Sequence, residues 1–280
     1  MATLAEERLA AGHPVEALAD VEADVRLRPA DAKLRVFLFQ LLAIVGQWQR
    51  ALAQLEVIGE LDAAALPMVH AYRGVIQGEM LRAKVFAGEA QPLVVGEPER
   101  WLALLIEALR LSRQGQAGAA SSLREEAFDQ AAATAGTLNG EAFAWLADAD
   151  PSLGPVIEAC LNGAYYWIPV HRLRRIEVEA PADLRDLVWA PAHLEWANGG
   201  QSVAFIPTRY CGSEAHPDGR VQLARKTEWR DLGGGLCAGA GQRILATDVG
   251  EYPLLEIREI VLKPAEEGSA PGSAAAAEAS

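Results

Sequence analysis

The sequence predicts an α+β protein, with an N-terminal tetratricopeptide-like α-helical repeat domain followed by a small C-terminal antiparallel β domain that resembles a partly open barrel. Helical apolar periodicity and a 34-residue repeat occupy the first half of the 280-residue chain. In the second half, short apolar segments alternate with clusters of Gly, Pro and polar residues, which is typical of strands joined by turns. We expect a helical-repeat domain at 1–135, a connecting segment with one helix at 136–163, a small β domain at 164–264 and a disordered tail at 265–280.

The first four expected helices form two repeat units. Gly12 and Gly46 lie 34 residues apart, and each is followed five residues later by an alanine, Ala17 or Ala51. A glycine permits a tight turn between two helices, and a small alanine lets the second helix pack close to the first. This spacing is the tetratricopeptide period. The expected helices are Leu4–Ala11, Val15–Arg28, Ala32–Val45 and Gln49–Glu60.

Three further helices are expected before the β domain. A long helix covers Leu66–Phe86, and an antiparallel pair covers Trp101–Arg113 and Ala119–Ala133. Gly115 and Ala120 repeat the five-residue offset in the turn of that pair. Two repeat units bury their apolar faces only against neighbours, so they need a cap, and we expect these helices to supply it.

The rest of the chain is expected to form strands after one more helix. Gly, Asn and acidic residues gather at 136–155, and the helix is expected at Leu153–Asn162, ended by Gly163. Because no helices intervene after it, the strands favour one small antiparallel sheet or a partly open barrel. The low-complexity end of the chain predicts disorder. The expected strands are Arg174–Val178, Val203–Ile206, Arg220–Thr227, Gln242–Ala246 and Glu256–Leu262.

Charge and cysteine content argue against several partners and cofactors. The net charge is −13, and an acidic chain is repelled by nucleic acid and by anionic membranes. No segment reaches the roughly 18 apolar residues that span a bilayer, and the N-terminus lacks the apolar core of a signal peptide. Cys160, Cys211 and Cys237 show no paired spacing, so neither a disulfide framework nor a zinc site is expected. We expect a cytoplasmic protein without metal or cofactor.

The stretch 203–248 contains residues that invite a catalytic interpretation. An enzyme hypothesis would place a charged site at Arg209, Glu214, Arg225 and Arg243. The opposing interpretation is that each charge pairs at the surface, which is common. A Gly-rich run at 233–241 lacks both the following helix and the lysine motif of a phosphate-binding loop, so a hairpin loop is favoured.

Several segments, spread in order over nearly the whole chain, carry a family resemblance. They are Arg35–Leu55, Tyr72–Gly88, Asp183–Ala192, Phe205–Glu214, Ala224–Trp229, Gly241–Asp248 and Leu254–Ile260. Together they resemble the ImpE/SciE/TagJ family of type VI secretion accessory proteins. Cys211 departs from the family pattern, which has Pro at that turn. The signature positions, whose role the resemblance does not assign, are Arg209, Tyr210, Gly212, Arg225, Thr227, Trp229, Gly241, Gln242 and Arg243.

The resemblance implies a non-enzymatic, cytoplasmic adaptor. Its implied partner is the small subunit of the contractile sheath, bound through that subunit's N-terminal helix. The helical half, the β half or the seam between them could hold this helix, because a groove suits an amphipathic guest. A regulatory role, in which the acidic chain competes with other partners for the sheath subunit, is a further alternative. If the helical half binds the guest, repeat geometry places four residues on the inner face: Lys33, Gln40, His70 and Gln77.

Overall fold

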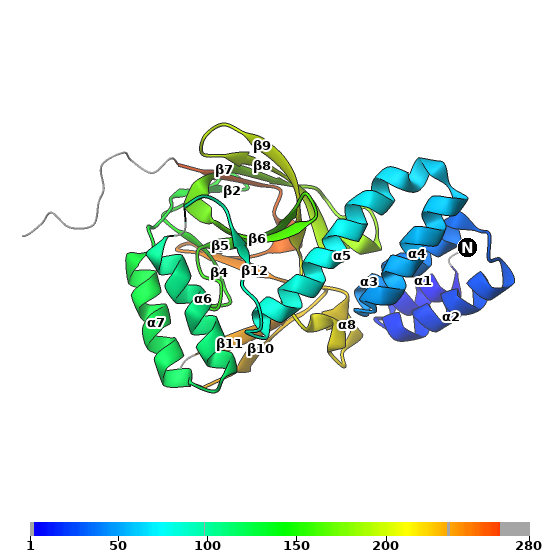
Figure 1. The fold of residues 1–280 in the computed structure, drawn as a ribbon, viewed down its shortest axis with the longest axis horizontal. Coiled ribbons are helices and arrows are strands. Elements are labelled where there is room, and N and C mark those ends of the chain that lie inside the picture. Colours follow the sequence, from blue (N-terminus) through cyan, green and yellow to red (C-terminus); the bar gives the residue numbers. More distant parts are fainter. Residues whose placement is uncertain (1–2, 98, 234–235, 264–280) are drawn as a thin grey trace, which may run out of the picture.

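The computed structural model describes residues 3–97, 99–233 and 236–263 of the chain. The first half is helical, as predicted, and the helices begin and end within two or three residues of their expected bounds. In Figure 1, α5 crosses from the first four helices to the pair α6 and α7. The helices are α1 (Leu4–Ala10), α2 (Pro14–Leu27), α3 (Ala32–Ile44), α4 (Trp48–Leu61), α5 (Leu66–Phe86), α6 (Arg100–Arg113) and α7 (Ala117–Gln130).

The helix turns have the geometry that the glycines predict. Gly12, Gly46 and Gly115 have φ values of +87°, +70° and +76°, which a side chain would disfavour. The alanine five residues after each glycine is buried against the preceding helix. These observations confirm the tight turns that the repeat predicts. No helix of the described residues is long and apolar enough to cross a membrane.

A nine-stranded sheet forms most of the second half. Its strand order is β1-β6-β5-β9-β8-β7-β14-β2-β3, so β1 and β3 are edges and the sheet is not closed. Neighbouring strands are antiparallel except for the parallel pair β1 and β6. The strands are β1 (Leu93–Val94), β2 (Gly136–Leu138), β3 (Glu141–Phe143), β5 (Val156–Leu161), β6 (Ala164–Pro169), β7 (Leu173–Val178), β8 (Trp189–Trp196), β9 (Gln201–Pro207) and β14 (Glu259–Leu262).

Two smaller sheets complete the fold. One has the order β13-β12-β4, and the other is the hairpin of β10 and β11. A short helix, α8 (Gly219–Gln222), and 3₁₀ turns at 170–172, 184–187, 213–215 and 254–256 connect the strands, and a further 3₁₀ turn at 63–65 joins α4 to α5. The strands are β4 (Leu146–Asp148), β10 (Thr227–Asp231), β11 (Cys237–Gly241), β12 (Ile244–Thr247) and β13 (Glu251–Pro253).

Two secondary-structure predictions are wrong. The segment Leu153–Asn162 contains no helix, because 156–161 form β5, which is buried at every position. A strand covered on both faces shows a continuous apolar run, and periodicity cannot separate such a run from a buried helix. The segment Arg220–Thr227 is not a strand either. Asp218 caps α8 there, accepting from the Arg220 amide at 2.9 Å, and β10 begins only at Thr227.

The expected connection and tail have different outcomes. The stretch 136–155 contains β2, β3 and β4, so strands begin well before the expected β domain. Its short strands escaped notice because three-residue elements between Gly, Asn and Pro show no readable alternation. The expected disordered tail at 265–280 lies outside the described residues.

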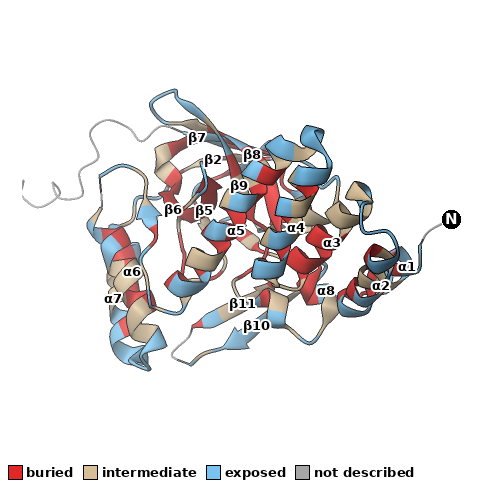
Figure 2. Ribbon diagram, turned by 45° about the vertical axis from the view of Figure 1, so that its right-hand side comes forward, coloured by how far each residue is buried: buried red, intermediate tan, exposed pale blue. Residues whose placement is uncertain are grey.

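The sheet separates two apolar cores. Its outer face, which includes Cys160, Tyr165 and Trp167, packs against the helices. Its inner face, which includes Ala159 and Ile206, closes on the smaller sheet through residues such as Leu245. In Figure 2 the buried residues gather between α5 and the strands behind it. The alternation of faces along each strand therefore decides which side chains meet α5.

Candidate functional site

Helix α5 lies directly on the outer face of the sheet, at the seam between the two halves. Glycines make this close approach feasible. A Cβ on Gly78 would lie 2.5 Å from Cys160 Sγ, and one on Gly74 would lie 2.6 Å from the Gly163 Cα. Both distances are shorter than contacts between real atoms, so no larger residue fits at either position without a backbone shift.

Beneath α5, charged side chains from the helix and the sheet form a buried network. Arg82 Nε donates to Glu158 Oε1 at 2.8 Å, and Arg82 Nη1 donates to Glu79 Oε1 at 2.8 Å. Arg243 Nη1 donates to Asp148 Oδ2 at 3.0 Å, and its Nη2 also contacts Glu158. Glu158 is 0% exposed and accepts from both guanidinium groups. The network therefore joins α5, β4, β5 and the start of β12 without access to solvent.

The two carboxyl groups that the sheets contribute to the network have pKa values shifted in opposite directions. Burial alone would raise the pKa of Glu158, but Arg243 and Arg82 together lower it to about 2. Burial raises the pKa of Asp148 to about 7, and the single guanidinium of Arg243 offsets this only in part. Glu158 is therefore the carboxylate on which both guanidinium groups depend.

Stability should therefore depend on pH through Asp148. Between its ordinary pKa of 3.8 and its folded value of about 7, the folded state holds a proton that the unfolded chain has released. The free energy of unfolding therefore falls as the pH rises through this window. We expect the stability of the wild type to fall relative to that of Asp148→Asn between about pH 4 and about pH 7. Urea unfolding of both proteins across this range measures the difference, and parallel curves would contradict the assignment.

Two signature arginines close the C-terminal ends of helices in the first half. Arg209, which follows β9, donates through Nη1 to the Ile44 carbonyl at 2.8 Å and also to the Gln222 carbonyl. Arg225 Nη1 donates to the Leu9 carbonyl at 2.7 Å. The last carbonyls of a helix lack partners within it and carry partial negative charge, so a cation satisfies them well. The two arginines thus tie α3 and α1 to the segment 209–225.

The glycine turns contact the same segment. A Cβ on Gly46 would lie 2.3 Å from the Glu214 Cγ, and one on Gly12 would lie 3.1 Å from the Arg220 Cγ. From the other side, a Cβ on Gly219 would lie 2.1 Å from the Gly12 carbonyl oxygen. Glycine is therefore needed at the turns of Gly12 and Gly46 for close packing as well as for their positive φ values.

The remaining signature residues support the hairpin of β10 and β11. Thr227 Oγ1 donates to the Gln242 carbonyl at 2.7 Å, and Gln242 Nε2 donates to the Ala224 carbonyl at 2.7 Å. The rings of Tyr210 and Trp229 lie 5.4 Å apart. Gly212 and Gly241 have φ values of +89° and +91°, and a Cβ on Gly241 would lie 1.9 Å from the Lys226 carbonyl oxygen.

The charged site of the enzyme hypothesis does not assemble. Arg209 and Arg225 close different helices, Glu214 packs on Gly46, and Arg243 lies in the buried network. None of the four lines the hollows described below. Among the described residues, no group of three His, Cys, Asp or Glu side chains could hold a metal ion. These charges hold parts of the fold together and do not converge on a substrate-sized space.

A groove of about 460 Å³ lies between α5 and the sheet. From α5 it is lined by His70, Arg73 and Gln77, and from β9 by Val203 and Phe205. His70, Arg73 and Gln77 share one exposed face of α5 because they are three and four residues apart. Val203 is 58% exposed, which is unusual for a valine in the middle of a strand.

The predicted partner-binding residues are only partly brought together. His70 and Gln77 both line this groove. Lys33 is exposed at the start of α3, away from it, and Gln40 is buried, at 8% exposure. The repeat pattern did not predict Arg73. Arg73 lies three residues after His70 and four residues before Gln77, so helical spacing alone would have placed it on the same face of α5.

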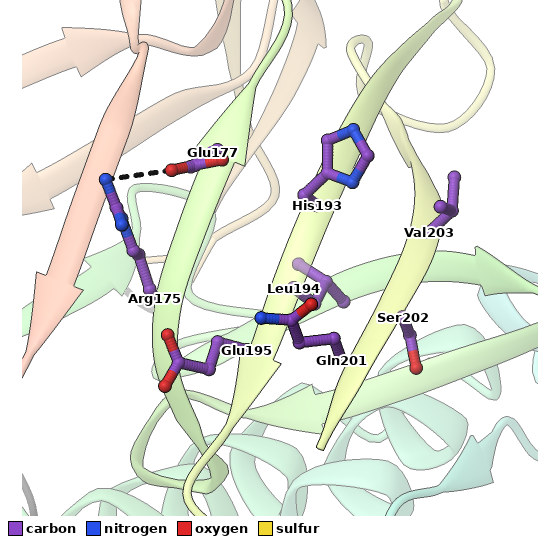
Figure 3. A pocket seen from close by; sticks show the side chains of 8 residues that line it. All are labelled: Arg175, Glu177, His193, Leu194, Glu195, Gln201, Ser202 and Val203. Carbon is purple, nitrogen blue, oxygen red and sulfur yellow. Dashed lines mark ion pairs between the residues drawn. The ribbon is translucent and has the colours of Figure 1, made fainter. Parts of the chain in front are cut away.

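A second hollow, of about 280 Å³, adjoins the groove on the outer face of β7, β8 and β9. Figure 3 shows Arg175 and Glu177 of β7, His193 of β8 and Val203 of β9 on these neighbouring strands. Val203 lines both hollows. We name the combined surface, from His70 on α5 through Val203 to Glu177, the α5 trough.

Comparison with known proteins gives consistent results. The family model described as ImpE protein matches residues 140–261. The type VI secretion system accessory component TagJ of Pseudomonas aeruginosa strain PAO1 is 51% identical over 264 residues, covering 94% of this chain and 92% of TagJ. The crystal structure of protein VPA1032 from Vibrio parahaemolyticus has the same fold, with a TM-score of 0.87 and 23% identity over 95% of this chain and 99% of that one. The chain therefore belongs to the ImpE/SciE/TagJ family.

Proposed function

We propose that this protein is a non-enzymatic, cytoplasmic accessory component of a type VI secretion system. Its proposed partner is the small subunit of the contractile sheath, whose N-terminal helix binds in the α5 trough. The membership of the family and the name of its P. aeruginosa relative support the secretion context. The observation that carries the binding proposal is the exposed apolar floor at Val203, which lies beside a surface helix.

The dimensions of the sheet suit a guest helix at this place. Helix α5 crosses the sheet: Gly78 meets Cys160 of β5 and Phe86 packs on Trp167 of β6, whereas Tyr72 packs on Phe205 of β9 and Trp189 of β8. Packed helices lie about 8–10 Å apart, and strands are spaced by about 4.8 Å. A helix beside α5 would therefore lie about two strands away, on the part of β9 and β8 beyond Phe205, where Val203 and His193 are exposed. That part of the outer face is the floor of the α5 trough.

The finer description of the fold is also part of this proposal. We interpret α1–α4 as two tetratricopeptide-like units, supported by the left-handed glycines at 34-residue spacing. We interpret the nine-stranded sheet as a partly open barrel, supported by the apolar core on its inner face. In this interpretation the guest occupies the seam between the two halves and not the concave face of the repeats.

Replacing Val203 by Asp should weaken binding of the sheath subunit by about ten- to a hundredfold. Burying a valine contributes about 1.5–3 kcal/mol, and each 1.4 kcal/mol corresponds to a tenfold change in the dissociation constant. Isothermal titration with the purified sheath subunit measures the loss. Val249→Asp is the matched control, because Val249 is 51% exposed in a turn away from the trough.

A pull-down with a sheath subunit that lacks its N-terminal helix tests the identity of the guest. The intact subunit should be retained and the truncated one should not. Equal retention of both forms would overturn the proposed partner segment. Equal affinities of Val203→Asp and Val249→Asp would instead overturn the α5 trough as its location.

A further inference from the structure

The two walls of the α5 trough carry opposite charge. On α5, His70 and Arg73 are exposed, whereas the helix has a single acidic residue, Glu79, which is buried in the network. Arg73 has no carboxylate partner within 4 Å among the described residues. The α5 wall therefore presents a free guanidinium group beside the apolar floor.

The opposite wall is acidic. Strand register places Val203 beside His193, His193 beside Glu177, and Glu177 beside Glu259 on the same face. Arg175 Nη2 is shared between Glu177 at 2.8 Å and Glu259 at 2.5 Å. Of the residues that line the hollow, Glu177 and Glu195 carry carboxylates and Arg175 carries a guanidinium group, and the rim of the wall adds two further carboxylates and one guanidinium group. The four carboxylates are Glu177, Glu179, Glu195 and Glu259, and the two guanidinium groups are Arg174 and Arg175.

A section across the trough therefore passes from a cation, past the apolar side chains of Val203 and Phe205, to excess negative charge. We propose that the trough selects an amphipathic helix whose apolar stripe has acidic residues on the side facing α5 and basic residues on the side facing β7. The identity of the guest as the N-terminal helix of the sheath subunit rests on the function proposed above. The charge pattern of the guest follows from the two walls alone.

This pattern also determines the direction in which the guest lies. Turning a helix end for end on a surface, with its apolar stripe still facing down, exchanges its left and right flanks. In the reversed direction the basic flank would face Arg73 and the acidic flank would face Glu177. Like charges would then meet on both sides, so only one direction is favoured.

Reversing the charge of Arg73 tests the proposal. The probe is a synthetic peptide of the N-terminal helix of the sheath subunit, titrated into the full chain at about 50 mM and about 500 mM salt. Arg73→Glu should weaken binding by about five- to tenfold at low salt and by less at high salt, because exposed charge pairs are modest and screened. Lys84→Glu is the matched control. It reverses another exposed cation on α5, outside the trough, and should leave the affinity within about twofold.

The acidic wall is tested in the same way. Glu177→Lys should weaken binding at low salt, whereas Glu251→Lys, on the exposed strand β13, should not. Unchanged thermal unfolding of these surface variants would exclude misfolding as the cause.

The outcomes separate this inference from the function on which it rests. If the peptide binds but Arg73→Glu and Lys84→Glu behave alike, the charge pattern is wrong and the proposed partner stands. If neither the peptide nor the intact subunit binds the wild type, both proposals fail. If the trough instead holds a second copy of this chain, the protein will form a concentration-dependent dimer that Arg73→Glu dissociates, and this result also overturns the inference.

Discussion

Replacing Glu158 by Gln should lower the free energy of unfolding by about 3–5 kcal/mol. Glu158 is 0% exposed and is the anion that Arg82 and Arg243 share. Its neutral replacement leaves two guanidinium groups without half of their countercharge, in a place that water does not reach. The cost of an uncompensated buried charge then dominates any loss of hydrogen bonding.

Chemical denaturation of the purified protein measures this loss. Glu107→Gln is the control, because Glu107 pairs with Arg110 at 2.5 Å on the surface of α6, where an ion pair contributes little. Its unfolding midpoint should stay close to that of the wild type. If Glu158→Gln unfolds at the same denaturant concentration as this control, the network does not hold α5 to the sheet in the way described.

Replacing Arg209 by Met should cost about 2–4 kcal/mol. Arg209 is buried without a carboxylate within 4 Å among the described residues, and burial lowers its pKa to about 10. Its donors go to backbone carbonyls, including those of Ile44 and Ala43 at the end of α3. Methionine fills similar volume but takes the donor away from the carbonyls of Ile44 and Gln222, whereas the Ala43 carbonyl keeps the Gly46 amide; each unsatisfied group costs about 1–3 kcal/mol.

Hydrogen exchange separates this effect from a general loss of stability. The amides in the last turn of α3 should lose protection before those of α6 do. Arg26→Met is the control, because Arg26 is exposed on α2. Equal protection of α3 in Arg209→Met and in the wild type would show that the cap contributes nothing.

Local patterns were enough to predict the helices and their turns. The 3.6-residue periodicity of α3 and the single φ-permissive residues Gly12 and Gly46 act within a few positions of the chain. The wrong prediction of a helix at β5 arose because the deciding contacts are not local. Every residue of Val156–Leu161 is buried, Glu158 included, because strands flank it on both sides and both of its faces are covered, and this information lies elsewhere in the chain.

The candidate site could not be predicted from local patterns either, because its residues have partners far away in the sequence. The charged residues near Arg209 look like an active site in sequence because four of them fall within 35 positions. Arg209 instead reaches Ile44, which is 165 residues away, and Arg243 reaches Glu158, which is 85 residues away. No local pattern reports such partners. The trough combines α5 with β7, β8 and β9, so periodicity could reveal only its α5 wall.

The arginine that closes α1 has a consequence for the time at which the protein can complete its fold. Arg225 and the Leu9 carbonyl are separated by 216 residues. At translation rates of about 5–20 residues per second, α1 leaves the ribosome on the order of 10–40 s before its cap exists. During most of synthesis the end of α1 is therefore held only by the backbone amides of its own turn, such as that of Gly12, and a chain that stops short of residue 225 lacks the arginine contact. The contacts between the first helices and the segment 209–225 are therefore complete only in a chain that extends beyond residue 225.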